Sequence, residues 1–221
     1  MSEMRAELLE VFGDDLMVVN TARVSFDKRK DVMDENDAKL IAYLAREGHW
    51  SPFSHPKAQF RVTMPIFVAR QWEKHRVGCV RGYDIYDQNE VSRRYVDSEP
   101  ELFWPTEWRT RPDGSIKQGS GTPLSGDAAV AVDFAVDRLY QEALHAYQAL
   151  LEARVAPEQA RMVLPQSMYT SWIETGSLAY WARLCKQRTD PHAQKEIADL
   201  AALVSEAMAA AFPISWRELT K

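Results

Sequence analysis

The residues best suited to chemistry lie in two neighbouring segments, 69–76 and 89–95. They read Ala-Arg-Gln-Trp-Glu-Lys-His-Arg and Asn-Glu-Val-Ser-Arg-Arg-Tyr. Residues 70–94 carry six Lys and Arg against four Asp and Glu, although the whole chain has a formal net charge of −5. Guanidinium groups bind phosphate through paired hydrogen bonds, and Glu and Ser suit the polar edge of a base. The two segments therefore predict a pocket for a small anion of the nucleotide type.

Local patterns predict the elements that carry these residues. No Gly or Pro occurs between Ile66 and Val77, which favours a helix with Gln71, Lys74 and His75 on one side. Just before it, residues 58–64 alternate between apolar and polar side chains, as in a half-buried strand, and Pro65 ends that strand. The segment 69–76 should therefore lie on a helix that directly follows a strand.

The other segments give a coarser prediction. Residues 8–24 contain two short apolar runs and predict a strand or a pair of strands, and residues 37–46 predict a helix that ends near Gly48. Residues 99–126, rich in Pro, Gly and Ser, predict an irregular surface loop. Four later segments have helical patterns: 127–154, 157–165, 177–187 and 190–211. The apolar side of the longest helix, 127–154, can serve the core or contacts between subunits.

Composition limits the class of protein. A chain of 221 residues with 46% hydrophobic content can form a single domain, residues 1–221, with a substantial core. An acidic pI of about 5.6 argues against broad nucleic-acid binding, and no apolar run is long enough for a membrane span. The only cysteines are Cys79 and Cys185, so no disulfide framework or paired-cysteine metal site is expected, and a reducing cytoplasm is favoured.

Taken singly, the candidate residues have ordinary structural explanations. The loop from His49 to His55 can be a packed turn, and His75 can be an interior histidine with satisfied hydrogen bonds. Arg161 and Arg188 can be surface ion pairs, which contribute well under about 1 kcal/mol each. Only their joint occurrence with other blocks favours a functional interpretation.

Six blocks in order resemble the flavin-dependent thymidylate synthases. They are residues 22–25, 48–55, 65–72, 74–76 together with 89–95, 160–165, and 188–196. The resemblance implies an α+β fold, with a twisted, largely antiparallel sheet packed with helices in a single domain. It also implies a homotetramer whose active sites combine residues of several chains. The implied reaction is the reductive methylation of dUMP to dTMP, with 5,10-methylenetetrahydrofolate as one-carbon donor and NADPH-reduced FAD as reductant.

Carried over position by position, the resemblance assigns roles to the motif residues. Those implied to contact FAD are Ser25, His55, Lys74, His75, Arg76, Glu90 and His192. Those implied to hold dUMP are Gln71, Ser92, Arg93, Arg94, Tyr95, Arg161 and Arg188, with the arginines on the phosphate and the polar groups on the base. Of these, Ser92, Arg94 and Arg188 are assigned to catalysis. Neither cysteine is expected to act as a nucleophile, and no metal is implied.

The chain departs from the family pattern in three places. Lys74 stands where the family has an arginine, Cys79 where it usually has a serine, and the spacer is longer by about residues 81–88. The extra segment should lie near the pocket mouth. These departures leave two alternatives: a related enzyme that modifies C5 of a pyrimidine nucleotide, by hydroxymethylation or on dCMP, and a catalytically silent nucleotide-binding or RNA-binding relative.

Overall fold

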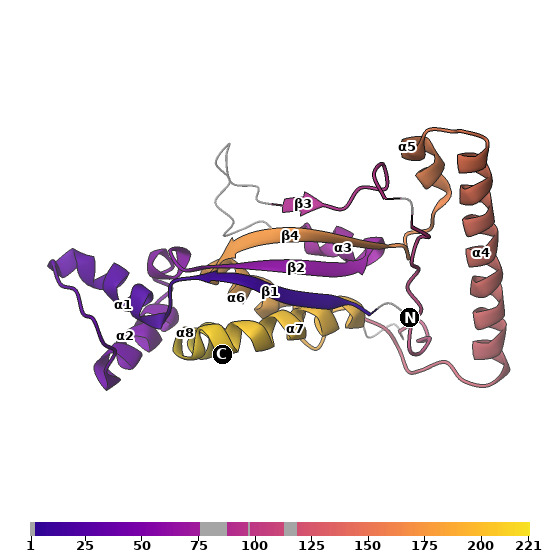
Figure 1. Ribbon diagram of the computed structural model, residues 1–221. Helices are drawn as coiled ribbons and strands as arrows, with labels where there is room; N and C mark the ends of the chain where they lie inside the picture. Colours follow the sequence, from indigo (N-terminus) through magenta and orange to yellow (C-terminus); the bar gives the residue numbers. More distant parts are fainter. Residues whose placement is uncertain (1–2, 76–87, 97, 113–118) are drawn as a thin grey trace.

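The protein is built around a four-stranded antiparallel sheet with the strand order β1-β2-β4-β3 (Figure 1). The computed structural model describes residues 3–75, 88–96, 98–112 and 119–221. The strands are β1 (Arg5–Phe12), β2 (Lys57–Pro65), β3 (Gln88–Glu90) and β4 (Tyr169–Ser177). An antiparallel sheet combined with helices confirms the predicted α+β class.

Strand β2 lies at the centre of the sheet and shows the predicted alternation. Phe60, Val62 and Met64 are fully buried, whereas Arg61 between them is exposed. Arg61 pairs with Glu7 of β1 on one side and with Ile173 of β4 on the other. The strand ends at Pro65, and α3 (Ile66–Trp72) begins with the next residue. The predicted strand over 58–64 and its end at Pro65 are therefore confirmed.

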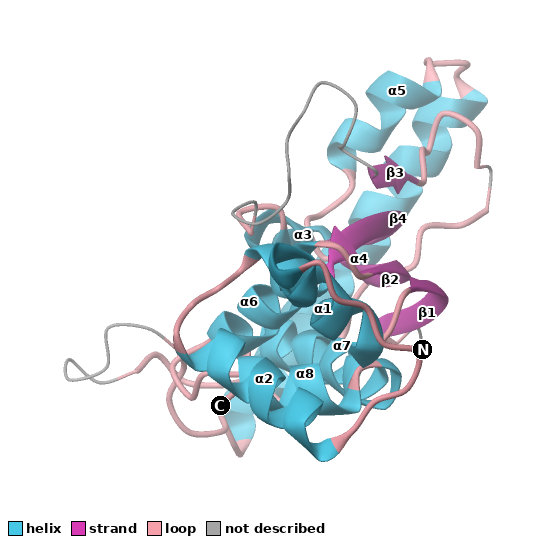
Figure 2. Ribbon diagram, turned by 90° about the vertical axis from the view of Figure 1, so that its left-hand side faces the viewer, coloured by secondary structure: helices cyan, strands magenta, loops and turns pink. Residues whose placement is uncertain are grey.

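Helices pack against one face of the sheet and enclose the core (Figures 1 and 2). They are α6 (Leu178–Arg188), α7 (Lys195–Ala211) and α8 (Pro213–Leu219), and at one end α1 (Asp15–Arg23) and α2 (Glu35–Arg46) adjoin them. Helix α6 is buried on nearly all sides because it lies between β4, α7 and α8. Trp181 of α6 stacks edge-on against Phe60 and donates from Nε1 to the Ala58 carbonyl oxygen at 3.0 Å.

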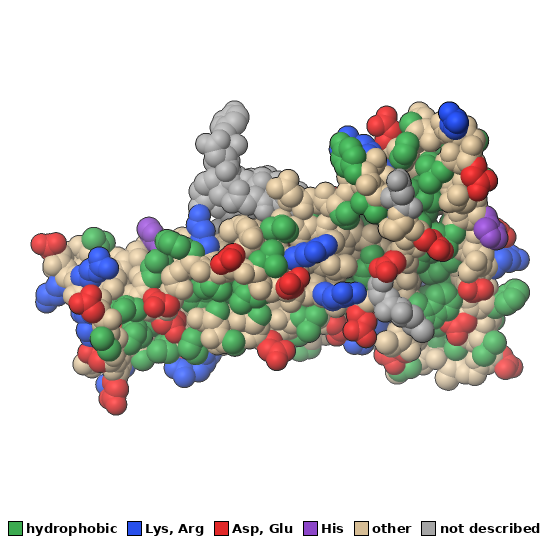
Figure 3. All heavy atoms as spheres, in the orientation of Figure 1, with side chains coloured by type: hydrophobic (Ala, Val, Ile, Leu, Met, Phe, Trp, Pro, Cys, Tyr) green, Lys and Arg blue, Asp and Glu red, His purple; other side chains and the backbone are tan. Residues whose placement is uncertain are grey.

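Helix α4 (Asp127–Glu152) stands apart from this body at the opposite end from α1 and α2 (Figure 1). Tyr147 is its buried residue, whereas Val130, Phe134 and Leu139 are 67%, 71% and 55% exposed. Hydrophobic side chains are visible along its outer surface in Figure 3. The apolar side of α4 therefore contributes little to the core of the single chain. After α4 come α5 (Pro157–Ala160) and the 3-10 turn η3 (Arg161–Val163).

Two predictions near the N-terminal half were wrong. The apolar run Leu16–Val19 belongs to α1 and not to a strand, because the Asp14 carboxylate accepts from the Met17 N–H at 2.8 Å and caps a helix. Helix α3 ends at Trp72, so Lys74 and His75 lie on the turn after it rather than on its side. The turn is closed by hydrogen bonds from the Lys74 and His75 N–H groups to the carbonyls of Gln71 and Trp72, at 3.2 and 2.9 Å.

The C-terminal half also differs from the prediction. Strand β4 was not predicted, and the helix expected over 157–165 is only α5 followed by η3. Helix α7 begins at Lys195 and not at Asp190, because the Asp190 carboxylate caps a separate turn by accepting from the His192 N–H at 2.8 Å. Within the described residues, no helix combines the length and apolarity needed to cross a membrane.

Candidate active site

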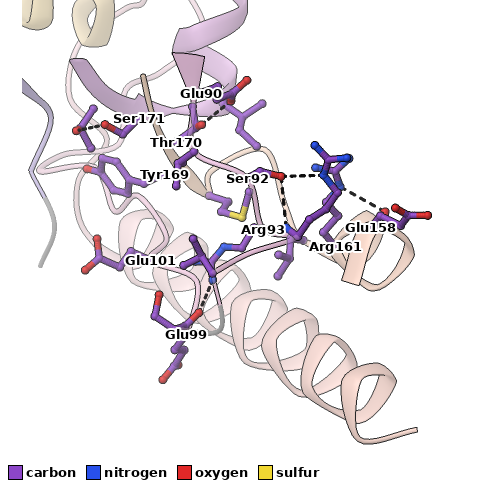
Figure 4. A pocket seen from close by; sticks show the side chains of 18 of the residues that line it. Glu90, Ser92, Arg93, Glu99, Glu101, Glu158, Arg161, Tyr169, Thr170 and Ser171 are labelled. Atoms are coloured by element: carbon purple, nitrogen blue, oxygen red, sulfur yellow. Dashed lines mark hydrogen bonds between the residues drawn. The ribbon is translucent and has the colours of Figure 1, made fainter. Parts of the chain in front are cut away.

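A cleft of about 890 Å³ opens between the end of β3 with the loop that follows it, the start of β4, and η3 (Figure 4). It brings together predicted site residues from segments about 70 positions apart: Glu90, Ser92, Arg93, Arg94 and Arg161. Glu90 is the last residue of β3, and Ser92, Arg93 and Arg94 lie in the loop after it. Arg161 is the first residue of η3. Sheet pairing and the return of the chain after α4 therefore place these groups around one space.

Local hydrogen bonds hold the loop after β3 in a defined conformation. The Val91 N–H donates to the Ser171 carbonyl oxygen at 2.8 Å, which extends the pairing with β4 by one residue. The Tyr95 N–H donates to the Ser92 carbonyl oxygen at 3.0 Å and closes a turn. Within that turn Arg94 Nε donates to Ser92 Oγ at 3.2 Å, and the Arg94 guanidinium carbon lies 5.2 Å from the centre of the Tyr95 ring. The Ser92 hydroxyl and the Arg94 guanidinium are thus held next to each other as two donors before any ligand binds.

Two of the arginines are free to meet an anion. Arg161 Nε donates to the Glu158 carbonyl oxygen at 3.3 Å. Considering only the residues that the structure describes, neither Arg94 nor Arg161 forms an ion pair with a carboxylate. Glu90, in contrast, accepts from the Thr170 hydroxyl at 2.5 Å. A phosphate could therefore bind to the arginines without breaking an existing ion pair.

A second group of predicted residues surrounds the end of α3. Arg188, at the end of α6, donates from Nε to His75 Nε2. Burial and the positive charges of Arg188 and Arg183 lower the pKa of His75 to about 4. His75 is therefore neutral at pH 7, and because Nε2 accepts a hydrogen bond, its proton resides on Nδ1. Lys74, on the turn after α3, and His192, on the turn before α7, are exposed.

A third group lies at the α1 end of the molecule. Ser25 belongs to the 3-10 turn η1 (Val24–Phe26), and His55 follows the 3-10 turn η2 (Ser51–Ser54). His55 lines a cleft of about 640 Å³ together with Lys28 and Arg29. None of the clefts found among the described residues contains members of all three groups. Arg76, Cys79 and most of the segment 81–88 lie outside the described residues.

The sequence analysis missed several residues of the first cleft. The outward side of β2 contributes Arg61 and Thr63, and β4 contributes Ser171. Thr63 Oγ1 donates to Ser171 Oγ at 3.0 Å, and Arg61 Nε lies 3.4 Å from the same oxygen. The polar half of the alternation over 58–64 was a usable signal for the first two. No local pattern marked Ser171.

Comparison with known proteins agrees with this architecture. The family described as "Thymidylate synthase complementing protein" matches residues 7–214. A flavin-dependent thymidylate synthase of Thermus thermophilus is 38% identical over 209 residues, which cover 95% of this chain and 73% of the relative. One of Kosmotoga olearia is 37% identical over 213 residues, covering 95% and 86% respectively.

The fold is shared with solved structures. The UMP/dUMP methylase PolB from Streptomyces cacaoi, bound with 5-Br dUMP, is 31% identical and superposes with a TM-score of 0.84 over 100% of this chain and 96% of PolB. The same enzyme bound with 5-Br UMP gives a TM-score of 0.83, 29% identity, and coverage of 100% and 95%. Likeness over nearly the whole chain places the protein among enzymes rather than binding modules. More narrowly, the chain belongs to the flavin-dependent thymidylate synthase family.

Proposed function

We propose that the protein methylates dUMP to dTMP reductively, with 5,10-methylenetetrahydrofolate as the one-carbon donor and NADPH as the source of electrons for FAD. The observation that carries this proposal is the cleft at the end of β3, where Ser92, Arg94 and Arg161 converge. Guanidinium groups without carboxylate partners suit the dianionic phosphate of a nucleotide. In the proposal these arginines hold the phosphate of dUMP, and Gln71 and Ser92 contact its base.

The reaction needs electron density at C5 of the uracil ring, which is a poor nucleophile. A positive group near the ring carbonyls would stabilise the negative charge that develops there, and we assign this role to Arg188. No cysteine thiolate is required. Cys185 is buried, burial raises its pKa to about 12, and its Sγ donates to the Ala201 carbonyl oxygen at 3.4 Å. Cys185 is therefore a core residue and not a nucleophile, and its reduced state suits the cytoplasm that we propose as the location.

The donor set of the chain fits a flavin dinucleotide. Lys28 and Arg29 beside His55 provide cations for a pyrophosphate, and neutral His75 offers its Nδ1–H to a polar ring edge. The residues that would hold the cofactor are Ser25, His55, Lys74, His75, Arg76, Glu90 and His192. When bound, reduced FAD would mediate the transfer of the one-carbon unit from the folate and would supply the reducing electrons. The side chains orient the nucleotide against it and exclude water.

We further propose that the working enzyme is a homotetramer with shared active sites. The three residue groups described above lie apart in one chain, so a second chain is needed to bring them around one pocket. The exposed apolar residues of α4, among them Val130, Phe134 and Leu139, provide a surface for that assembly. Association through α4 would bury these side chains.

The direct test uses the purified protein. Its visible spectrum should show bound flavin that bleaches when NADPH is added. With dUMP, methylenetetrahydrofolate and NADPH it should release a product with the mass of dTMP, and omission of any one component should abolish product formation. A colourless protein, or a product about 16 mass units heavier than dTMP, would contradict the proposal.

A second candidate is methylation of UMP. It is favoured by the likeness to PolB, which is described as a UMP/dUMP methylase and was solved with both 5-Br nucleotides. The same assay run with UMP separates the two candidates. A kcat/KM for UMP equal to or above that for dUMP would make the ribonucleotide the substrate.

A further inference from the structure

A continuous network of polar contacts runs from the loop before α4 to Gln71, the residue that the proposed function assigns to the base of dUMP. Arg109 Nη2 donates to Glu196 Oε1, and Gln194 Nε2 donates to Glu196 Oε2 at 3.0 Å. Gln194 Oε1 in turn accepts from Gln71 Nε2. Arg109, Gln194 and Glu196 have no role in the function proposed above. They connect the loop, the start of α7 and the end of α3.

Glu196 and Gln194, the two residues of this network at the start of α7, are held in place. Glu196 is 7% exposed and lies in the first turn of α7, where the helix dipole favours a negative charge. Arg109 is anchored by a second bond, from Nε to Ser120 Oγ at 2.7 Å. Gln194 is the N-cap residue of α7, yet its side chain makes no capping bond, because its amide bridges Glu196 and Gln71.

The negative charge on Glu196 fixes which group donates and which accepts in each hydrogen bond of the network. Burial raises the pKa of Glu196, but hydrogen bonds from Arg109 and Gln194 outweigh burial and lower that pKa below its ordinary value. An ionised carboxylate can only accept, so Gln194 must turn its NH₂ toward Glu196 and its oxygen toward Gln71. Gln71 must then turn its NH₂ toward Gln194. Its carbonyl oxygen Oε1 is therefore the group left to accept from a ligand.

We infer that Glu196 and Gln194 position the Gln71 amide so that it presents an acceptor to the base and selects a uracil ring over a cytosine ring. This inference rests on the proposed function, in which Gln71 contacts the pyrimidine. The N3 atom of uracil carries a hydrogen and donates, whereas the N3 atom of cytosine accepts. A fixed acceptor pairs with the first and leaves two acceptors facing each other with the second, which is the situation that gives strong discrimination.

The test compares binding of dUMP and dCMP to the flavin-loaded enzyme by titration calorimetry. Gln194→Met removes the bridging amide but keeps the Arg109–Glu196 ion pair, so that the Gln71 amide can rotate. The preference for dUMP over dCMP should fall roughly tenfold, the usual effect of one hydrogen bond. Glu196→Gln should act in the same direction, because a neutral amide can both donate and accept. Asp199→Asn is the matched control, since Asp199 is exposed on the same helix and pairs with Lys195.

The outcomes separate the inference from the function on which it rests. If Gln194→Met leaves the ratio of the two dissociation constants unchanged, or weakens both nucleotides equally, the inference is overturned. If Glu196→Gln does not fold, Gln194→Met alone decides. Absence of dUMP binding in the unaltered protein would refute the proposed function and would be seen before any variant is compared.

Discussion

Arg94 shows how a single guanidinium is prepared for an anion, since its Nε–H is bonded to Ser92 Oγ and it has no carboxylate partner within the described residues. Arg94→Ala should weaken dUMP binding more than tenfold, because a hydrogen bond between charged groups contributes about 1.5–3 kcal/mol. Titration calorimetry measures the change. Arg217→Ala, an exposed arginine of α8 paired with Glu218, is the control and should bind as the unaltered protein does. Equal affinity in both variants would remove Arg94 from the site.

His75 makes stability depend on pH. Its pKa is about 4 in the folded protein against 6.5 in an unfolded chain, so between these values the unfolded chain binds more protons. Its contribution to stability is complete above pH 6.5 and is lost as the pH falls toward 4. The melting temperature should therefore drop less between pH 7 and pH 5 in His75→Gln than in the unaltered protein. Identical pH profiles would contradict the half-buried Arg188–His75 contact, and His145→Gln, which alters an exposed histidine of α4, serves as control.

For single residues, the sequence predicted which side chains suit phosphate binding better than it predicted where they lie in space. The types of Ser92, Arg94 and Arg161 indicated phosphate binding, but only the resemblance connected positions so far apart. The fold meets that expectation by bringing η3 next to the loop after β3. Gln194 and Glu196 lay inside a block that was recognised, yet nothing local showed that their side chains reach Gln71, because that contact depends on how α7 docks against α3.

Among the elements, the junction of β4 and α6 is closely packed. A Cβ atom on Gly176 would lie 2.2 Å from Tyr180 Cδ1 and 3.0 Å from Trp181 Nε1. Neither ring can move freely, since Tyr180 donates to Glu174 and Trp181 to Ala58. Gly176→Ala should therefore lower the free energy of unfolding by about 1–3 kcal/mol. Urea denaturation measures this, and Thr175→Ala on the outward side should cost clearly less.

Helix α4 carries a second prediction at this scale. Phe134→Ser places a hydroxyl in the apolar surface proposed for assembly and should shift the protein to smaller oligomers, as measured by light scattering after gel filtration. Its melting curve as a monomer should show a folded core, because Phe134 is 71% exposed in the single chain. Gln148→Ala, also exposed on α4, should leave the assembly intact. An unchanged mass in Phe134→Ser would place the interface elsewhere.

Strands and helices were predictable from the sequence where one face of the element is exposed to solvent and the other is buried. Strand β2 alternates in sequence because Gln59, Arg61 and Thr63 face outward, while Phe60 and Val62 face the core. Strand β4 lacks such a pattern, because Tyr169, Thr170 and Trp172 are all buried and Gly176 leaves room for aromatic rings. The run Leu16–Val19 was misassigned because four apolar residues fit a strand as well as a helix, and the cap at Asp14 decided the outcome.

For the whole molecule, the proposed sharing of active sites predicts complementation between inactive chains. Arg161 and His75 belong to different residue groups, so in the proposed assembly one pocket takes them from different subunits. Arg161→Ala and His75→Ala should each have little activity alone. Mixed after dissociation and reassembly, they should regain dTMP synthesis, because some pockets then receive both native side chains. Activity of the mixture no greater than the sum of its parts would show that each pocket is built from one chain.

The separation of α4 from the core has a consequence for how the enzyme responds to dilution. The sheet and the helices α6 to α8 bury an apolar core within one chain, so we expect each chain to stay folded on dilution. In the proposed assembly the pocket, in contrast, needs encounters between chains through α4. Specific activity should therefore fall on dilution while circular dichroism stays constant, and it should return when the sample is concentrated again. Catalysis in such a protein is set by the cellular abundance of the polypeptide as well as by its fold.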